Sequence, residues 1–264
     1  MNFKSFDQLL LHYETYGDPA SPSILLIHGI GADYKMWKPQ ITSLPAAGYF
    51  VIVPDLRGHG SSEIPATFRI SDCARDLNDL LAELHLQRTH LVGVSMGGMV
   101  AQQFVLQYPE HALSQVLVDT LSGITRPVER FNAWLAAVLL QIFPSKLQAN
   151  LIRNSYKKLG HEGVGEYFED RLAHMSPRWL LAARQEVNRF SVISELAKMN
   201  LPTLVLVGDT FGKLAINMAR TTAEGIPDTH FQVLEGGGDP SNLLVPEAFD
   251  KAVLEFLSRV KENS

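Results

Sequence analysis

The stretch Gly93-Val94-Ser95-Met96-Gly97 decides the fold, because it places G-x-S-x-G between an apolar run and a helical pattern. The run before it, 90–94, is typical of a buried strand, and 97–107 has the periodicity of a helix that ends before Pro109. A turn this tight strains the backbone at the serine and leaves no room for side chains two residues to either side. The spacing therefore predicts that Ser95 presents its hydroxyl above a sheet, at a helix N-terminus that favours negative charge.

Strand-like and helical segments alternate along most of the chain, which predicts a parallel sheet with crossover helices. Ser71 is the expected N-cap of a helix that runs to about Leu86, and Pro246 suits the first turn of a C-terminal helix. The fold class is therefore α/β. The expected strands are Leu9–Tyr16, Ile24–His28, Phe50–Pro54, His90–Val94, Gln115–Asp119, Thr203–Gly208 and His230–Leu234.

One long segment interrupts this alternation. Residues 122–199 carry only helical signals, and within them 131–143 repeat apolar residues at helical spacing. A helical insertion between two strands lies at their carboxyl ends, where such sheets bind ligands. We therefore expect a core of residues 1–121 and 200–264 and a helical cap of residues 122–199. Phe131 and Trp134 of this cap suit an apolar or aromatic substrate, although they equally suit ordinary helix packing.

Composition argues against several classes of function. The chain of 264 residues has 46% hydrophobic residues and a formal charge of −5 with both signs interspersed, so no nucleic-acid partner is expected. No run approaches the ~18 apolar residues of a membrane span, and the N-terminal residues lack the pattern of a secretory signal. We expect a cytoplasmic protein without a membrane partner, a metal or a cofactor; an oligomer is possible. Cys73 is the single cysteine, and a structural thiol is expected rather than a catalytic one.

Two further motifs accompany the serine turn. His28-Gly29-Ile30-Gly31 follows one expected strand, and PDLRGHGSS at 54–62 follows the next. Together with the serine turn, these motifs resemble the α/β-hydrolase superfamily over essentially the whole chain. Within it, HGIGADYKMWKPQ and PSNLLVPEAFDKAVLEFL look most like the small esterase and 3-oxoadipate enol-lactonase branch. The resemblance implies a mostly parallel eight-stranded sheet flanked by helices, with a helical cap inserted after strand 6.

The resemblance also implies a substrate site beside the serine. The N–H groups of Ile30 and Met96 would form the oxyanion hole, and His28, Gly29 and Gly31 would border the substrate. The resemblance implies a small-molecule substrate. It implies no cofactor, so the protein's own groups would carry out the reaction.

The family's histidine is replaced in this chain. Members hold a serine, then an acid and then a histidine in chain order, and the histidine takes and returns the serine proton. In this branch the histidine lies in a stretch like G-A-G-H-x-S-N-L before a helix that starts with Pro-Glu. Here 237–243 read GGDPSNL and Pro246-Glu247 fixes the register, so Asp239 stands in the histidine's place.

The family's acid is displaced as well. An aspartate is expected three residues after the glycine that ends the seventh strand, yet Phe211 stands there. Asp209 comes two residues early, and a turn residue is the favoured interpretation over the catalytic acid. Asp119, at the end of the preceding strand, is a second candidate, because some members hold their acid there; it could also simply satisfy loop N–H groups. Phe211 facing Asp239, among glycines, would give Asp239 an apolar setting that raises its pKa.

Loss of the triad histidine costs on the order of 10⁶ in turnover. We therefore expect an enzyme that acts on a small, largely apolar carbonyl substrate at Ser95 by non-hydrolytic acid–base chemistry, of the lyase, decarboxylase, cyclase or isomerase type, with Asp239 as acid or base. One alternative is a weak hydrolase of esters, lactones or thioesters, assisted by His161 or His174 of the cap. Another is an inactive protein that binds a ligand or a protein. We do not favour an altered form of an ordinary hydrolase, because the chain differs from the family's pattern at two separate positions, Asp239 and Phe211.

Overall fold

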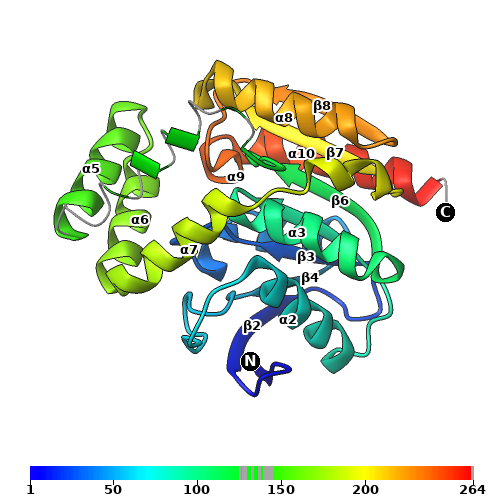
Figure 1. Cartoon of the computed structure of the whole chain (residues 1–264). Coiled ribbons are helices and arrows are strands. Elements are labelled where there is room, and N and C mark those ends of the chain that lie inside the picture. Colours follow the sequence, from blue (N-terminus) through cyan, green and yellow to red (C-terminus); the bar gives the residue numbers. More distant parts are fainter. Residues whose placement is uncertain (125, 127–129, 132–133, 136–137, 139–144, 263–264) are drawn as a thin grey trace.

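The computed structural model describes residues 1–262 except 125, 127–129, 132–133, 136–137 and 139–144. Within this part of the chain, eight strands form one sheet in the order β1-β2-β4-β3-β5-β6-β7-β8 (Figure 1). β1–β2 and β2–β4 pair antiparallel, and every neighbouring pair from β4 to β8 is parallel. The expected mostly parallel sheet is confirmed. The strands are β1 Asn2–Lys4, β2 Leu10–Tyr16, β3 Ser23–Ile27, β4 Phe50–Pro54, β5 Thr89–Val94, β6 Ala112–Val118, β7 Thr203–Gly208 and β8 Thr229–Leu234.

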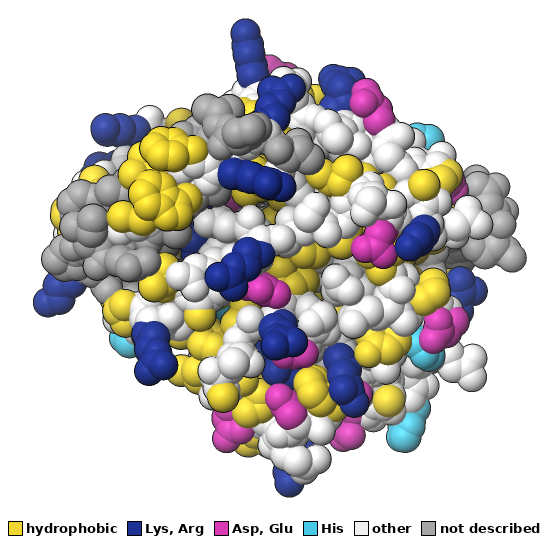
Figure 2. Space-filling view, in the orientation of Figure 1, with side chains coloured by type: hydrophobic (Ala, Val, Ile, Leu, Met, Phe, Trp, Pro, Cys, Tyr) yellow, Lys and Arg dark blue, Asp and Glu magenta, His cyan; other side chains and the backbone are white. Residues whose placement is uncertain are grey.

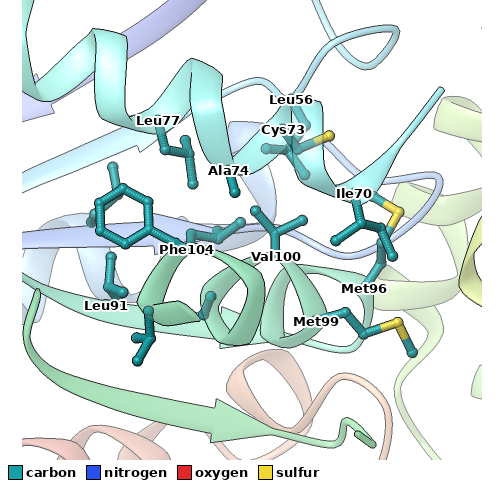
Figure 3. Close-up of a cluster of buried hydrophobic side chains, with 14 of the residues drawn as sticks. Leu56, Ile70, Cys73, Ala74, Leu77, Leu91, Met96, Met99, Val100 and Phe104 are labelled. Atoms are coloured by element: carbon teal, nitrogen blue, oxygen red, sulfur yellow. The ribbon is translucent and has the colours of Figure 1, made fainter. Parts of the chain in front are cut away.

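Helices cover both faces of the sheet, which explains why every residue of β3, β4, β5 and β7 is buried. Helices α2, α3 and α8 pack on one face, and α1 and α10 pack on the other. Figure 3 shows the first of these layers, in which Ala74 and Leu77 of α2 lie opposite Val100 and Phe104 of α3. The helices of the two layers are α1 Gln40–Ala46, α2 Ile70–Glu83, α3 Met96–Gln107, α8 Lys213–Gly225, α9 Ser241–Leu244 and α10 Pro246–Glu262, with 3-10 turns η1 Tyr34–Trp37, η2 Pro109–His111, η3 Ile193–Lys198 and η4 Asp209–Phe211.

The part of the segment between β6 and β7 that the structure describes contains what we call the helical insertion, made of α5 Ser145–Lys158, α6 Glu162–His174 and α7 Pro177–Arg189. In Figure 1, α5 and α6 lie side by side away from the sheet, and α7 leads back to it. Trp179 of α7 is buried and packs edge-on against Phe68, with ring centroids 5.4 Å apart. The insertion is therefore anchored in the core through α7. The helix expected over 131–143 lies largely outside the described residues.

Local boundaries differ from the sequence prediction at a few points. β6 begins at Ala112, and the short strand β1 was not predicted, because three residues are too few to show a pattern. Ser71 is not the N-cap of α2; the helix begins at Ile70 after an extended Arg69 that makes no side-chain cap. The Ile70 N–H instead donates to Glu186 Oε1 of α7 at 3.3 Å, so a tertiary contact satisfies this helix end.

The surface of the molecule carries both hydrophobic and charged side chains. In Figure 2, hydrophobic side chains lie at the side of the face where the insertion is and in further groups elsewhere, and charged side chains of both signs are spread between them. The large exposed apolar residues between β6 and β7 include Phe131, Trp134, Leu147, Leu151 and Leu159. In the described part of the chain, no helix has the length and apolar character that a membrane crossing requires.

Candidate active site

The turn at Ser95 has the strained geometry that its sequence predicts. Ser95 has φ 55° and ψ −119°, between the end of β5 and the start of α3. A Cβ at Gly93 would collide with the Gly97 carbonyl, and a Cβ at Gly97 would collide with the Ile27 carbonyl. The turn is fixed by neighbouring strands and loops, because the Ser95 N–H donates to Val118 O at 2.8 Å and Thr120 Oγ1 donates to Ser95 O at 2.6 Å. The serine is therefore held rigidly at the carboxyl edge of the sheet.

Asp239 is the direct partner of the serine hydroxyl. Ser95 Oγ donates a hydrogen bond to Asp239 Oδ2 at 3.0 Å. Asp239 lies in the loop between β8 and α9, and its own carbonyl oxygen accepts a hydrogen bond from the Tyr156 hydroxyl of α5 at 2.6 Å. Burial raises the pKa of Asp239 to about 6, although the Ser95 hydrogen bond and the positive charge of Arg184 oppose the rise. A carboxylate with this pKa titrates close to neutral pH.

Asp119 lies below this pair and organises the loops around it. Its Oδ1 accepts from the Gly208 N–H at 2.8 Å, and its Oδ2 accepts from the Ser241 N–H at 2.7 Å. Asp119 is 2% exposed and has φ 47°, so the end of β6 is strained to present this side chain. Burial, and then the neighbouring Asp239 carboxylate, raise the pKa of Asp119 to about 7. Asp119 thus ties the ends of β7 and of the Asp239 loop together.

The loop after β3 passes directly beside the serine. A Cβ on Gly29 would lie 3.3 Å from Ser95 Cβ. The N–H groups of Ile30 and Met96 donate no hydrogen bond to any residue that the structure describes, so both remain available to an oxygen bound beside Ser95. His28 supports this loop from below: its Nδ1 donates to Gly29 O at 2.8 Å, and its Nε2 accepts the Leu56 N–H at 2.9 Å.

Because both His28 nitrogens are occupied and burial lowers its pKa, His28 is neutral and structural. The ring is fully buried and does not line the cavity beside Ser95. Gly31 has φ 74° and packs near Leu172 of α6, also without lining the cavity. Of the three residues expected to border the substrate, the structure places Gly29 there.

A buried carboxylate joins the same loop to the helical insertion. Asp33 follows Ile30 by three residues, is fully buried and accepts from Tyr167 OH at 2.9 Å. Its other oxygen is 2.6 Å from Arg171 Nη1, and the Asp33 N–H donates to Tyr167 OH at 2.9 Å. Tyr167 and Arg171 belong to α6. This cluster of Asp33, Tyr167 and Arg171, which we call the Asp33 clamp, fixes α6 over the loop that carries the Ile30 N–H.

A cavity of about 230 Å³ opens between Ser95 and the helical insertion. Its floor holds Ser95, Asp239 and the loop at Gly29 and Ile30, and its wall is mostly apolar. Two charged residues line it, Asp239 and Arg184 of α7. The remaining lining residues are Ala32, Met36, Val94, Gln148, Ile152, Ser155, Tyr156, Phe168, Leu172, Leu180 and Pro240. The volume is small for a ligand site, which limits the substrate to a small molecule.

The structure places other expected residues away from this cavity. Asp209 accepts the Gly236 N–H at 2.8 Å and is exposed, as a turn residue is. Phe211 is 42% exposed, so it does not provide an apolar setting for Asp239; Leu180, Ile152 and the cavity's other apolar residues line that side instead. Phe131 and Trp134 are each 57% exposed and lie outside the cavity lining. The helical spacing of the apolar residues in 131–143 does not predict which of their side chains face the core of the protein.

No histidine lines the cavity among the described residues. His161 precedes α6 and caps it with its carbonyl oxygen, and His174 is exposed with its ring bonded to Asp170 O. The two histidines considered as substitutes for the base therefore do not reach Ser95 in this structure. Arg184 was missed by sequence reasoning, because an isolated polar residue on an amphipathic helix resembles any solvated one, and Tyr156 was considered only as one of several aromatic residues of the cap. The described residues contain no His, Cys, Asp and Glu group that could hold a metal. Cys73 is a buried core residue, as expected.

The chain is similar to proteins that are named as hydrolases. It is 30% identical over 257 residues to a protein of Variovorax paradoxus named as the carbamate hydrolase RutD, covering 95% of this chain and 97% of the relative. It is 27% identical over 253 residues to 3-oxoadipate enol-lactonase 2 of Acinetobacter baylyi, covering 94% and 93%. The crystal structure of a thermophilic esterase from Thermogutta terrifontis with bound malate matches with a TM-score of 0.85, 28% identity and 98% coverage of both chains.

These relatives correct the expected chemistry. The replacement of the triad histidine by Asp239 favoured a lyase, decarboxylase, cyclase or isomerase reaction, but the relatives that span the whole chain are named as a hydrolase, a lactonase and an esterase. The non-hydrolytic interpretation was therefore wrong, and the hydrolase alternative is the better one. The expected rise in the pKa of Asp239 was taken to favour proton transfer with the substrate rather than proton transfer from Ser95.

The model of the alpha/beta hydrolase fold matches residues 22–244, which is most of the chain. The sheet order, the serine turn after β5 and the relatives near the enol-lactonase branch agree with this match. The chain belongs to the α/β-hydrolase fold family and is an enzyme of that superfamily.

Proposed function

We propose that this enzyme hydrolyses small esters or lactones, with Ser95 as nucleophile and Asp239 as the general base in place of histidine. The observation that carries the proposal is the 3.0 Å hydrogen bond from Ser95 Oγ to Asp239 Oδ2 at the floor of the cavity. A nucleophile in direct hydrogen-bond contact with its base is the arrangement that acyl transfer requires.

The pKa of Asp239 makes the carboxylate a plausible base. An ordinary aspartate has a pKa near 3.9 and an ordinary histidine one near 6.5, and burial brings Asp239 to about 6. A general base works best when its pKa lies near the operating pH, because it is then both deprotonated and strong enough to accept a proton. Asp239 meets both conditions at neutral pH.

The catalytic cycle follows from these contacts. Ser95 Oγ attacks the substrate carbonyl carbon while its proton passes to Asp239 Oδ2, and the carbonyl oxygen becomes an oxyanion that the Ile30 and Met96 N–H groups bind. The carbon–oxygen bond to the alcohol then breaks, and the Asp239 proton goes to the departing oxygen. A water molecule next gives a proton to Asp239 and attacks the acyl-Ser95 ester, which releases the acid and returns the proton to Ser95.

An aspartate base differs from histidine in charge. Protonated histidine is a cation that stabilises the nearby oxyanion, whereas protonated Asp239 is neutral, so turnover should be slower than with an intact triad. Slow proton transfer favours substrates with reactive carbonyl groups, such as lactones and esters, over the less electrophilic carbamates. Among the named activities of the relatives, we therefore assign ester or lactone hydrolysis to this chain.

The helical insertion acts as a cap in this proposal. Helices α5, α6 and α7 each contribute residues to the cavity wall, and the Asp33 clamp holds α6 over the oxyanion loop. The apolar wall excludes water from the attacking serine, which strengthens the electrostatic interactions at the oxyanion. The volume of about 230 Å³ suits a small substrate.

Hydrolysis of 4-nitrophenyl butyrate, measured with the wild-type enzyme and with Ser95→Ala, tests the proposal. Intact-mass analysis after treatment with a fluorophosphonate probe shows independently whether Ser95 becomes labelled. We expect labelling of the wild type, none of Ser95→Ala, and loss of hydrolysis in the variant. Hydrolysis that survives Ser95→Ala, or a wild type that neither hydrolyses the ester nor takes the label, would argue against a serine hydrolase.

A further inference from the structure

Arg184 is the one positive charge among the described residues that line the cavity. It lies on α7, and its side chain is half-buried. Its Nε is buried without a hydrogen-bond partner, and no other guanidinium nitrogen of Arg184 makes a hydrogen bond or an ion pair with the described residues. A guanidinium group offers five donors in a plane. Leaving the buried Nε donor unpaired in an apolar wall costs free energy unless a ligand satisfies it.

The surroundings of Arg184 favour an anion as that ligand. The cavity wall that Arg184 shares is mostly apolar, and it includes Leu180, one turn earlier on α7, and Ile152 of α5. Burial lowers the pKa of Arg184 and the Asp239 charge raises it, yet an arginine keeps its charge in proteins. The Asp239 carboxylate, however, is engaged by the Ser95 hydroxyl and makes no ion pair with Arg184. The guanidinium plane is therefore free to form the paired hydrogen bonds that a carboxylate accepts.

We propose that Arg184 binds a carboxylate group of the substrate, so that the enzyme acts on small esters or lactones that carry a free carboxylate. This inference rests on the proposed function, because it names the substrate class of the same site. In this arrangement the carbonyl lies between Ser95 and the Ile30 N–H, and the carboxylate lies across the cavity at α7. Asp239 repels a carboxylate in its own vicinity, so the two charged residues together fix the direction in which the substrate lies.

Arg184 could instead serve only as a counter-charge that stabilises ionised Asp239. That role predicts the same loss for every substrate when Arg184 is replaced, because the base would be affected whatever the substrate. Carboxylate recognition predicts a loss that is confined to substrates bearing the carboxylate. The ratio of kcat/KM for a substrate with the carboxylate to kcat/KM for one without it therefore distinguishes the two roles, whereas a single rate does not.

Two matched pairs of esters test the inference. The first pair places the carboxylate on the acyl side, 4-nitrophenyl hemiglutarate against 4-nitrophenyl pentanoate; the second places it on the alcohol side, 3-acetoxypropanoate against propyl acetate. We expect the wild type to prefer the carboxylate ester of at least one pair by about 10- to 100-fold in kcat/KM, mainly through KM, as for a charge-assisted hydrogen bond. Arg184→Gln should abolish this preference, and Arg184→Lys should restore part of it.

Arg178→Gln is the matched control, because Arg178 lies on the same helix but is exposed and outside the cavity lining. It should keep the wild-type preference. Equal losses for both members of each pair in Arg184→Gln, or the absence of any carboxylate preference in the wild type, would overturn carboxylate recognition.

Binding separates a failure of this inference from a failure of the proposed hydrolysis. Calorimetric titration of Ser95→Ala with hemiglutarate methyl ester needs no turnover, so it works even if the enzyme hydrolyses none of the esters. Binding that is lost in the Ser95→Ala, Arg184→Gln double variant supports the Arg184 site whatever the reaction. Equal binding by both variants, or a lack of binding by Ser95→Ala, contradicts it.

Discussion

Ser95 Oγ and Asp239 Oδ2 are 3.0 Å apart and joined by a hydrogen bond, although one residue follows β5 and the other follows β8. The resemblance to the family leads us to expect a histidine at this position, and here the Asp239 carboxylate contacts the serine. The contact requires the Asp239 loop to lie close to the serine turn, which Asp119 secures from below through the Ser241 N–H. The nucleophile and the base are therefore in contact, but the base is a carboxylate and its charge differs from that of a histidine.

The pH dependence of hydrolysis should follow the ionisation of Asp239. The base is active when deprotonated, so kcat/KM for a neutral ester should rise with pH through about 6, with the coupled ionisation of Asp119 near 7 broadening the rise. Initial rates with 4-nitrophenyl butyrate between pH 4.5 and 8.5 measure this, after correction for spontaneous hydrolysis. Rates that fall across this range would contradict a carboxylate base.

Stability should change with pH in the opposite direction. The pKa values of Asp239 and Asp119 in the folded protein, about 6 and about 7, exceed the unfolded value near 3.9, so the folded protein holds protons that the unfolded chain has released. The free energy of unfolding should therefore decrease as pH rises from about 4 to about 7. For Asp239 alone the decrease is at most about 3 kcal/mol.

Tm measured at several pH values for the wild type, Asp239→Asn and Asp209→Asn checks this. Asp239→Asn should flatten the decrease, whereas Asp209→Asn, which alters an exposed turn residue, should keep the wild-type slope. Asp76, whose pKa burial raises to about 6, contributes equally to all three proteins. Parallel slopes in all three would mean that Asp239 has no raised pKa.

Tyr156 should position the catalytic loop from the cap. Burial raises the pKa of its hydroxyl, which therefore stays protonated and donates to the Asp239 carbonyl at 2.6 Å. Tyr156→Phe removes this bond and keeps the ring that stacks on Phe168. We expect the free energy of unfolding to fall by only about 1 kcal/mol, but kcat to fall about tenfold because Asp239 loses its alignment with Ser95. A change in KM alone would contradict a positioning role.

The Asp33 clamp should matter more for stability than the exposed ion pairs of the insertion. Asp33 is 1% exposed and Arg171 is 24% exposed, whereas Arg153 is 38% exposed and pairs with exposed or half-buried glutamates on α6. Arg171→Gln should lower the free energy of unfolding by about 1–3 kcal/mol, and Arg153→Gln by less than about 1 kcal/mol. Urea unfolding of the two variants measures the difference. Equal losses of unfolding free energy would show that the Asp33 clamp stabilises the protein no more than the exposed ion pairs do.

The sequence predicted the sheet and the serine turn because both depend on local patterns. Apolar runs alternate with helical segments, and Gly93 and Gly97 occupy places where a Cβ has no room. The choice between Asp119 and Asp209 could not be made in the same way, since both follow strands of the sheet. Only the three-dimensional arrangement places Asp119 beneath the catalytic loop and Asp209 in an exposed turn.

Residues of the insertion were the hardest to predict. An amphipathic pattern identifies the apolar face of a helix but not the element against which that face docks. Phe131 and Trp134 were therefore expected at a site that they do not line, and Arg184, which lines it, was not expected. The raised pKa of Asp239 was expected from an apolar setting beside Phe211, but Phe211 is exposed and burial in the cavity raises the pKa instead. The distance from Asp239 to Ser95 is not encoded in the residues next to Asp239.

The most direct test of the account is the kcat/KM of Asp239→Asn for 4-nitrophenyl butyrate. Asparagine has the size of aspartate and can still accept the Ser95 hydrogen bond, but it cannot take the proton. The account predicts a fall of about 10²- to 10⁴-fold, with Asp209→Asn within about twofold of the wild type. Wild-type hydrolysis by Asp239→Asn, in an enzyme that Ser95→Ala inactivates, would contradict the role of Asp239 as the base.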